Sequence, residues 1–142
     1  MTVRVERTFE LDADPEDVWE FIADPERRAR FISVVEGFER KGEGYAIWHI
    51  AIPTRLTDRT IAVETEDKEV RDGEFVRFVG KSKVMRVQGE HHVEPTETGA
   101  RLVNRFVVDG RIPGIERYFE KNLDSELDNL ETAIRDYLDD HP

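Results

Sequence analysis

The sequence of 142 residues contains no cysteine, only 2 methionines and only 5 lysines. The absence of cysteine excludes disulfides, thiolate metal sites and cysteine nucleophiles. No apolar run approaches the roughly 20 residues that a membrane-spanning helix needs, so we expect no integral membrane association. Charged residues interrupt the first residues of the chain, where a signal segment would be apolar. We therefore expect a cytoplasmic protein.

Cations are scarce relative to acids: 32 Asp and Glu stand against 21 Lys and Arg, which gives a formal net charge of -11. Such an excess disfavours contact with nucleic-acid phosphates, and we expect no nucleic-acid partner. Of the cations, 16 are arginine. This combination resembles the proteins of extreme halophiles, in which salt screens the repulsion between carboxylates, and it predicts a haloarchaeal source. An ordinary acidic mesophilic protein is the alternative.

The length predicts one domain, residues 1–142, with a single core. Over residues 3–11 apolar and polar side chains alternate, which indicates a half-buried strand. Asp14-Pro15 and Asp24-Pro25 each provide an N-cap and a proline at the first helical position, so two short helices follow. From position 115 apolar residues recur every three or four positions and predict a helix of about 25 residues. Turn sequences separate six further expected strands of an antiparallel meander, at 34–40, 45–52, 60–67, 74–80, 83–94 and 100–109.

This α+β pattern resembles the helix-grip fold of the START and SRPBCC superfamily, which includes polyketide cyclases, lipid-transfer domains and coenzyme Q-binding proteins. The resemblance covers the whole chain and is carried by DPEDVW at 14–19, DPER at 24–27 and PGIERYF at 113–119. It implies a curved seven-stranded antiparallel sheet wrapped around the long C-terminal helix, with two short helices after strand one. It also implies a largely apolar pocket between the sheet and the long helix.

The long helix carries polar residues on the face that should be apolar. At about 100° per residue, Glu126 shares the face of Ile115 and Phe119, and Tyr118 and Asn122 flank that face. An unpaired buried ion is costly, so these residues are candidates to line the pocket and hold the polar end of an amphipathic ligand. The alternative is that they pair with one another or with their neighbours.

Three polar residues of the strands have the same inward phase: Arg7, His91 and Asn104. We interpret them as further ligand-binding candidates, with paired or structural roles again as the alternative. Phe31 and Trp48 complete the set, because the resemblance places the second short helix and the third strand beside the pocket. Core packing is the alternative for both aromatic residues.

No pattern in the sequence indicates a metal or a cofactor, and we expect neither. His91 and His92 are adjacent, and consecutive strand residues point to opposite faces, so one ion cannot easily bind both. None of the three serines lies in a nucleophile elbow, and no glycine-rich phosphate loop is present.

The leading hypothesis is the non-catalytic binding or transport of a hydrophobic small molecule by a monomer or weak dimer. A lipid, an isoprenoid quinone and a polyketide-like compound are the ligand classes that the resemblance implies. The alternative is a cyclase or dehydratase, in which Glu126 or His91 acts as general base and Arg7 or Tyr118 polarises a carbonyl. A protein-interaction module, of the chaperone co-activator or ribosome-associated toxin kind, is third.

Overall fold

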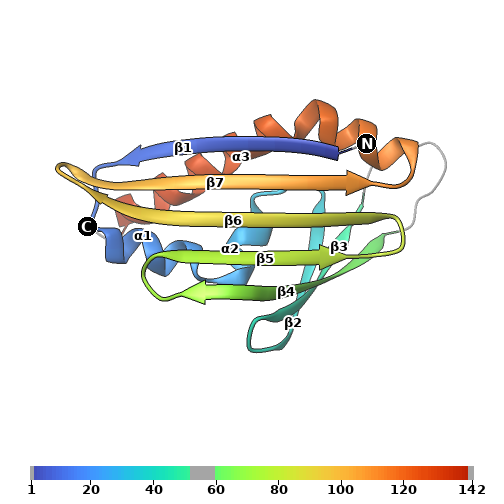
Figure 1. The fold of residues 1–142 in the computed structure, drawn as a ribbon, viewed down its shortest axis with the longest axis horizontal. Coiled ribbons are helices and arrows are strands. Elements are labelled where there is room, and N and C mark those ends of the chain that lie inside the picture. Colours follow the sequence, from blue (N-terminus) through green and yellow to red (C-terminus); the bar gives the residue numbers. More distant parts are fainter. Residues whose placement is uncertain (1, 52–59, 141–142) are drawn as a thin grey trace.

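The computed structural model describes residues 2–51 and 60–140. Within them, seven strands and three helices follow the expected order, with two short helices directly after the first strand (Figure 1). The strands are β1 (Thr2–Leu11), β2 (Val35–Gly42), β3 (Tyr45–Ile50), β4 (Ile61–Arg71), β5 (Phe75–Lys81), β6 (Met85–Thr96) and β7 (Gly99–Gly110). The helices are α1 (Pro15–Ile22), α2 (Pro25–Arg30) and α3 (Pro113–Asp140).

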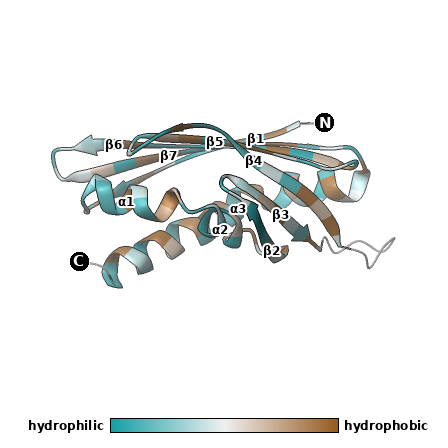
Figure 2. Cartoon of the chain, turned by 90° about the horizontal axis from the view of Figure 1, so that it is seen from below, coloured by the Kyte–Doolittle hydropathy of each residue, from teal (hydrophilic) through white to brown (hydrophobic). Residues whose placement is uncertain are grey.

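The strands form one antiparallel sheet in the order β1-β7-β6-β5-β4-β3-β2. Figure 2 shows the helices on one face of this sheet, which bends through β4 toward β3 and β2 so that its end curves past α2 and α3. The other face is left open. This arrangement confirms the predicted α+β helix-grip fold, with its curved sheet and long C-terminal helix.

The two short helices begin where the sequence predicts. The carboxylates of Asp14 and Asp24 accept hydrogen bonds from the backbone N–H groups two residues later, each at 2.9 Å, and a proline occupies the first turn of each helix. An N-cap of this kind satisfies an amide that the helix itself leaves unpaired. Because the cap fixes the start of α1 at Pro15, Val18 and Ile22 lie one turn apart on the same face, and both are buried in the core.

Helix α3 has 28 residues, which corresponds to about 42 Å of axis, and it crosses the covered face of the sheet. Its predicted apolar stripe is confirmed as buried: Ile115, Phe119, Leu123, Leu127, Leu130 and Ile134 are at most 2 % exposed. Among residues 2–51 and 60–140 no helix is both long and apolar enough to cross a bilayer.

The element boundaries differ from the expected ones where the side-chain pattern ends. Strand β4 continues to Arg71 instead of ending at 67, and its pairing with β5 shifts register between Asp67 and Glu69. Residues 68–71 are exposed, so no alternation marks them as a strand. The strand expected over 45–52 ends at Ile50, and position 52 lies outside the described residues.

Candidate ligand-binding site

An aromatic cluster occupies the space between the sheet and the helices. The Phe78 ring lies 5.6 Å from Trp48 and 6.2 Å from Phe106, centroid to centroid, and Phe106 lies 5.6 Å from Phe31. Gly89 makes room for these rings, because a Cβ there would lie 2.3 Å from Phe78 Cε1 and 3.0 Å from Phe106 Cε1. The cluster therefore depends on a glycine in the middle of β6.

His91 lies inside this cluster, fully buried between β6 and its aromatic neighbours. Its Nδ1 is 2.7 Å from Asn104 Oδ1, while the Asn104 amide nitrogen donates to the backbone carbonyls of Arg7 and Leu102. Since the Asn104 oxygen faces the ring, Nδ1 carries the proton. Burial lowers the pKa of His91 to about 3, so the ring is neutral and its Nε2 is a hydrogen-bond acceptor.

Arg28 is the largest polar side chain of the interior and is only 2 % exposed. One of its guanidinium nitrogens, Nη2, donates to both carboxylate oxygens of Asp67, at 2.9 and 3.0 Å. The Cζ atom lies 5.3 Å from the centre of the Phe78 ring, whose plane is also nearly parallel to that of His91. Arg28 and His91 therefore both contact the same phenylalanine.

Three buried polar atoms around Phe78 have no hydrogen-bond partner among the described residues: Arg28 Nε, Arg28 Nη1 and His91 Nε2. Two of them are donors and the third is an acceptor. A pocket bounded in part by Arg28, Trp48 and Phe78 has a volume of only about 10 Å³. That is roughly the space of one water molecule, so this pocket leaves no room for a larger molecule beside Arg28.

An open groove lies on the helical side of this interior, with a volume of about 520 Å³. Its walls include Phe21, Arg27, Phe31, Ser33, Asn129 and Ala133. Phe31 belongs to both regions, because it lines the groove while its ring packs edge-on against Phe106. The volume of the groove is within the range of small-molecule sites.

Glu126 holds the segment after α2 against α3. Its carboxylate accepts hydrogen bonds from Ser33 N at 2.6 Å, Ser33 Oγ at 2.9 Å and Asn129 Nδ2 at 3.1 Å. The Tyr118 hydroxyl is 3.4 Å from Ser33 Oγ. Partial burial raises the pKa of Tyr118, the Ser33 contact opposes this, and Glu126 adds to the rise, so the phenol stays protonated.

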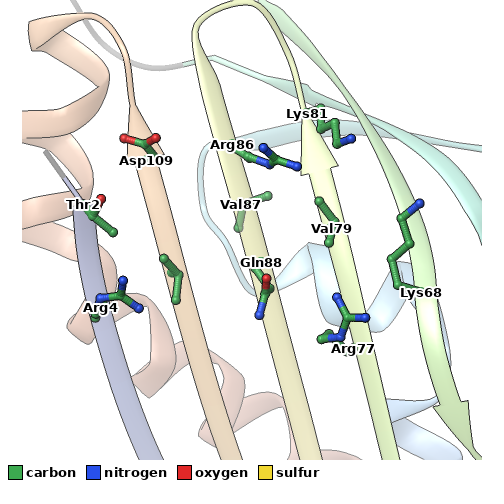
Figure 3. A pocket seen from close by; sticks show the side chains of 11 residues that line it. Thr2, Arg4, Lys68, Arg77, Val79, Lys81, Arg86, Val87, Gln88 and Asp109 are labelled. Atoms are coloured by element: carbon green, nitrogen blue, oxygen red, sulfur yellow. The ribbon is translucent and has the colours of Figure 1, made fainter.

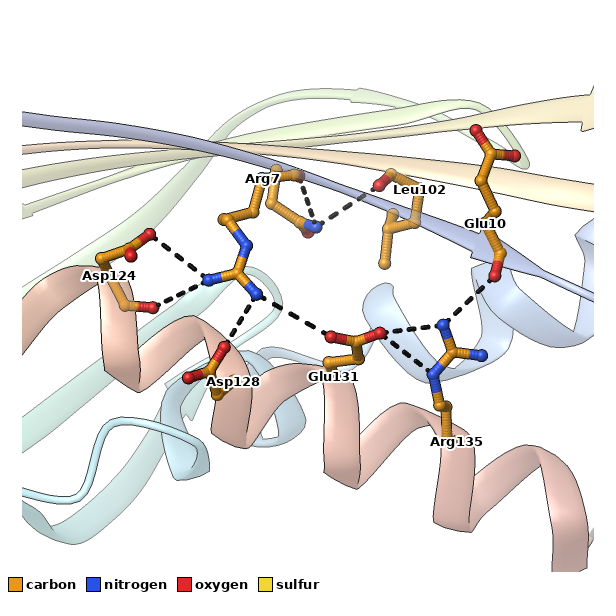
Figure 4. Close-up of polar contacts among 8 residues, drawn as sticks. Arg7, Glu10, Leu102, Asp124, Asp128, Glu131 and Arg135 are labelled. Atoms are coloured by element: carbon orange, nitrogen blue, oxygen red, sulfur yellow. Dashed lines mark hydrogen bonds and ion pairs between the residues drawn. The ribbon is translucent and has the colours of Figure 1, made fainter.

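Arg7 lies apart from these groups, on the flank of α3 (Figure 4). Its guanidinium donates to the Asp124 side chain at 3.3 Å and to Asp128 at 2.7 Å, and it is 3.8 Å from Glu131. The hydrogen bond to Asp128 raises the pKa of Arg7. The guanidinium therefore ties β1 to α3, while the Arg7 carbonyl accepts a hydrogen bond from Asn104 in the interior.

The predicted residues thus divide into three groups. The aromatic interior brings together Phe31, Trp48, His91 and Asn104. Tyr118 and Glu126 meet at Ser33, and the third group is the Arg7 network. Asn122 donates to the Tyr118 carbonyl one turn earlier in α3. Asn104 joins the aromatic interior to Arg7 through the Arg7 carbonyl. Asn129 joins it to Glu126, because its amide nitrogen donates to the Phe31 carbonyl at 3.2 Å and to the Glu126 carboxylate at 3.1 Å.

The sequence reasoning missed Arg28 and Asp67, and it also missed Ser33 and Asn129 beside Glu126. Asn129 was within reach of the same argument, since it follows Glu126 by three residues on a helix. Arg28 lies in a short helix rich in arginine and gives no periodic signal. Among residues 2–51 and 60–140, no group of three or more His, Asp or Glu side chains is arranged to hold a metal ion.

These features define a helix-grip domain of the START-like class, with a polar cluster inside an aromatic interior and a groove beside it. The family model for polyketide cyclase / dehydrase and lipid transport matches residues 2–135, and the chain belongs to this family. No curated protein matches the sequence significantly.

Solved structures are similar over the whole chain. A conserved protein from Geobacillus kaustophilus has a TM-score of 0.74 at 15% identity, covering 99% of this chain and 98% of its own. A START superfamily protein from Mycobacterium smegmatis has a TM-score of 0.73 at 13% identity, covering 98% and 99%. The di-domain ARO/CYC StfQ of the steffimycin biosynthetic pathway has 0.67 at 11% identity, with 98% of this chain and 52% of that protein. At these identities the similarity shows the fold.

Proposed function

We propose that the protein binds an amphipathic small molecule of the lipid, isoprenoid quinone or polyketide-like class, without transforming it. The observation that carries this proposal is the set of unpartnered atoms of Arg28 and His91 inside an aromatic shell. Such groups usually have partners, and leaving them unpaired is costly. A ligand whose polar group pairs with the free atoms of Arg28 and His91 removes this cost, and the free energy regained favours binding.

The chemistry of the three atoms favours a hydroxyl group on the ligand. The oxygen of a hydroxyl accepts from Arg28, and its hydrogen is donated to the neutral His91 Nε2. The apolar body of the ligand then lies among the aromatic rings and in the groove. We infer that the Phe31 ring, which contacts both regions, turns aside when the ligand enters.

Binding of 2-naphthol and naphthalene, followed by NMR chemical shifts, tests this proposal. We expect 2-naphthol to bind about tenfold more tightly, because only its hydroxyl satisfies Arg28 and His91. Phe31→Ala is expected to strengthen the binding of both compounds by joining the groove to the interior. Tyr45→Ala, which removes an exposed ring on β3, is the control and should change neither affinity. Equal affinity for the two compounds, or no saturable binding, would contradict the proposal.

A cyclase or dehydratase activity is the second candidate, and the free acceptor His91 Nε2 together with the free donors of Arg28 around one phenylalanine favours it. The Glu126 carboxylate already accepts three hydrogen bonds and Arg7 is held by acids, so His91 and Arg28 replace them in the proposed roles. His91 Nε2 would take a proton from carbon beside a carbonyl, and Arg28 would stabilise the enolate oxygen. Because burial lowers the pKa of His91, this step depends on the enolate charge to stabilise the imidazolium. Deuterium exchange into acetylacetone, accelerated by the protein and lost in His91→Gln, would support this activity. Exchange at the buffer rate in both proteins would exclude it for this probe.

We also propose that the acid excess is an adaptation to salt and that the protein works in the cytoplasm as a monomer or weak dimer. The net charge of -11 supports the first part, because repulsion among carboxylates is screened in concentrated salt. We expect the melting temperature to be lower near zero salt than in molar potassium chloride. Calorimetry at both concentrations checks this, and an unchanged melting temperature would count against adaptation to salt.

A further inference from the structure

The open face of the sheet carries a cationic hollow, although the chain as a whole is strongly acidic. The hollow has a volume of about 520 Å³ and lies over β1, β7, β6, β5 and β4, on the face opposite the helices. Five of its lining residues are cations and one, Asp109, is an acid. The cations are Arg4, Lys68, Arg77, Lys81 and Arg86.

The register of the strands explains why this surface is hollow. Val107, Gln88 and Val79 are cross-strand neighbours in one row of the sheet and form an uncharged floor. Long cationic side chains flank that row: Arg77 and Lys81 are two residues before and after Val79 on β5. Figure 3 shows Arg86 and Lys81 on one side of Val79 and Arg77 on the other. Short side chains in the middle and long ones around them make a shallow basin.

Most of these cations form no close ion pair, although acids are their cross-strand neighbours: Glu69 and Glu90 lie opposite Arg77, Glu64 opposite Lys81 and Asp109 opposite Arg86. Within the described residues, Arg4, Arg77, Lys81 and Arg86 make no ion pair, and only Lys68 does, with Glu66 at 2.7 Å. Elsewhere on the same face the arginines are paired: Arg101 is 2.6 Å from Glu10, and Arg105 is 3.0 Å from Glu6. The basin therefore differs from the rest of its sheet face in that four of its five lining cations lack a close ion pair.

We propose that this basin binds a compact anion with two or more phosphate groups, independently of the ligand in the helical side of the domain. Arginine forks match phosphate oxygens in geometry, and three arginines line the basin. Along a strand, Arg77 and Lys81 are four residues apart, which is about 13 Å between Cα atoms, so a chain of phosphates reaches both ends of the basin with less bending of the side chains than a single phosphate requires. A chain of phosphates spans more of the rim and faces Arg86 and Lys68 as well.

Calorimetric titration with tripolyphosphate, pyrophosphate and inorganic phosphate tests the proposal. We expect saturable binding of one tripolyphosphate per chain, weaker binding of pyrophosphate, and weaker binding still of phosphate. The double variant Arg77→Gln/Arg86→Gln should weaken tripolyphosphate binding by about tenfold or more. The matched control is Arg101→Gln/Arg105→Gln, which removes the same charge from the same face. It should change the affinity by less than about twofold, because those arginines are already paired.

Equal weakening of tripolyphosphate binding in the two double variants would overturn the proposal. The loss would then follow from the change in net charge and not from the basin. Absence of saturable tripolyphosphate binding would also overturn it. Sedimentation with phosphatidylcholine vesicles, with and without phosphatidylserine, distinguishes a membrane surface from a soluble phosphate compound. Binding to the anionic vesicles without binding of tripolyphosphate would reject the proposed ligand in favour of a lipid surface. Because the substituted side chains lie on the open face of the sheet, circular dichroism should show all variants folded.

Discussion

Asp67→Ala is expected to lower the free energy of unfolding by about 3–5 kcal/mol, the largest effect of any single substitution that we predict. The substitution removes the acceptor of both hydrogen bonds from Arg28, whose side chain is 2 % exposed. A buried guanidinium then lacks its counter-charge, in addition to the two nitrogens that are already unpartnered. Urea denaturation followed by circular dichroism measures the change.

The matched control is Glu69→Ala, two residues further along β4. Glu69 also pairs with an arginine, Arg71 at 3.4 Å, but both side chains are about half exposed. An exposed pair contributes roughly 0–1 kcal/mol, so this variant should remain close to the parent protein. Similar losses for Asp67→Ala and Glu69→Ala would show that the Arg28 charge reaches water in the folded state.

A double replacement separates the cost of the lone charge from the value of the pair. In Arg28→Met/Asp67→Leu both charges are absent and apolar groups of similar length take their place. Replacing both partners of a buried pair is often neutral or stabilising, so we expect most of the stability lost in Asp67→Ala to return. If the double variant is as unstable as Asp67→Ala, the pair is required for packing and not only for charge compensation.

The fold could be predicted from the sequence because its determinants are local and periodic. Asp14-Pro15 and Asp24-Pro25 set the helix starts, and the apolar stripe of α3 continues without a break to Ile134. The outer half of β4 could not be predicted, because residues 68–71 are exposed on both faces and pair only with β5. A strand without a buried side has no period to detect.

The candidate site could be predicted only in part, for a physical reason. Inward phase identified His91 and Asn104 correctly as neighbours of the core, since position along a strand fixes which face a side chain takes. The same argument applied to Arg7, but a long side chain at the sheet edge leaves the interior and reaches the acids of α3. Phase gives the direction of Cβ and does not give the place of a guanidinium four bonds further out.

Arg28 is the opposite case, because it is buried although its local sequence indicates an exposed side chain. Its neighbours Arg27 and Arg30 are exposed or half-exposed, so composition marks α2 as a polar helix. The partner that makes its burial tolerable, Asp67, is 39 residues away. No local pattern contains a pair of this kind, because the fold and not the sequence spacing brings its members together.

Glu126→Ala is expected to lower the free energy of unfolding by about 2–4 kcal/mol, because it removes an acceptor of three hydrogen bonds. The partly buried Ser33 N–H then loses its carboxylate partner. Glu126→Gln should cost about half as much, since an amide keeps one acceptor oxygen and the Ser33 hydroxyl can turn to accept from its nitrogen. The control is Glu120→Ala, an exposed acid on the same helix, which should remain within about 0.5 kcal/mol of the parent.

Hydrogen exchange separates a local role of Glu126 from a general loss of stability. The carboxylate joins α3 to the segment between α2 and β2, which also forms part of the groove wall through Ser33. In Glu126→Ala the Ser33 amide should therefore exchange at least about tenfold faster, and the increase should exceed that of the Leu102 amide on the internal strand β7. Equal acceleration at both amides would mean that Glu126 supports the whole fold, and that its contact with the groove wall has no separate effect on the site.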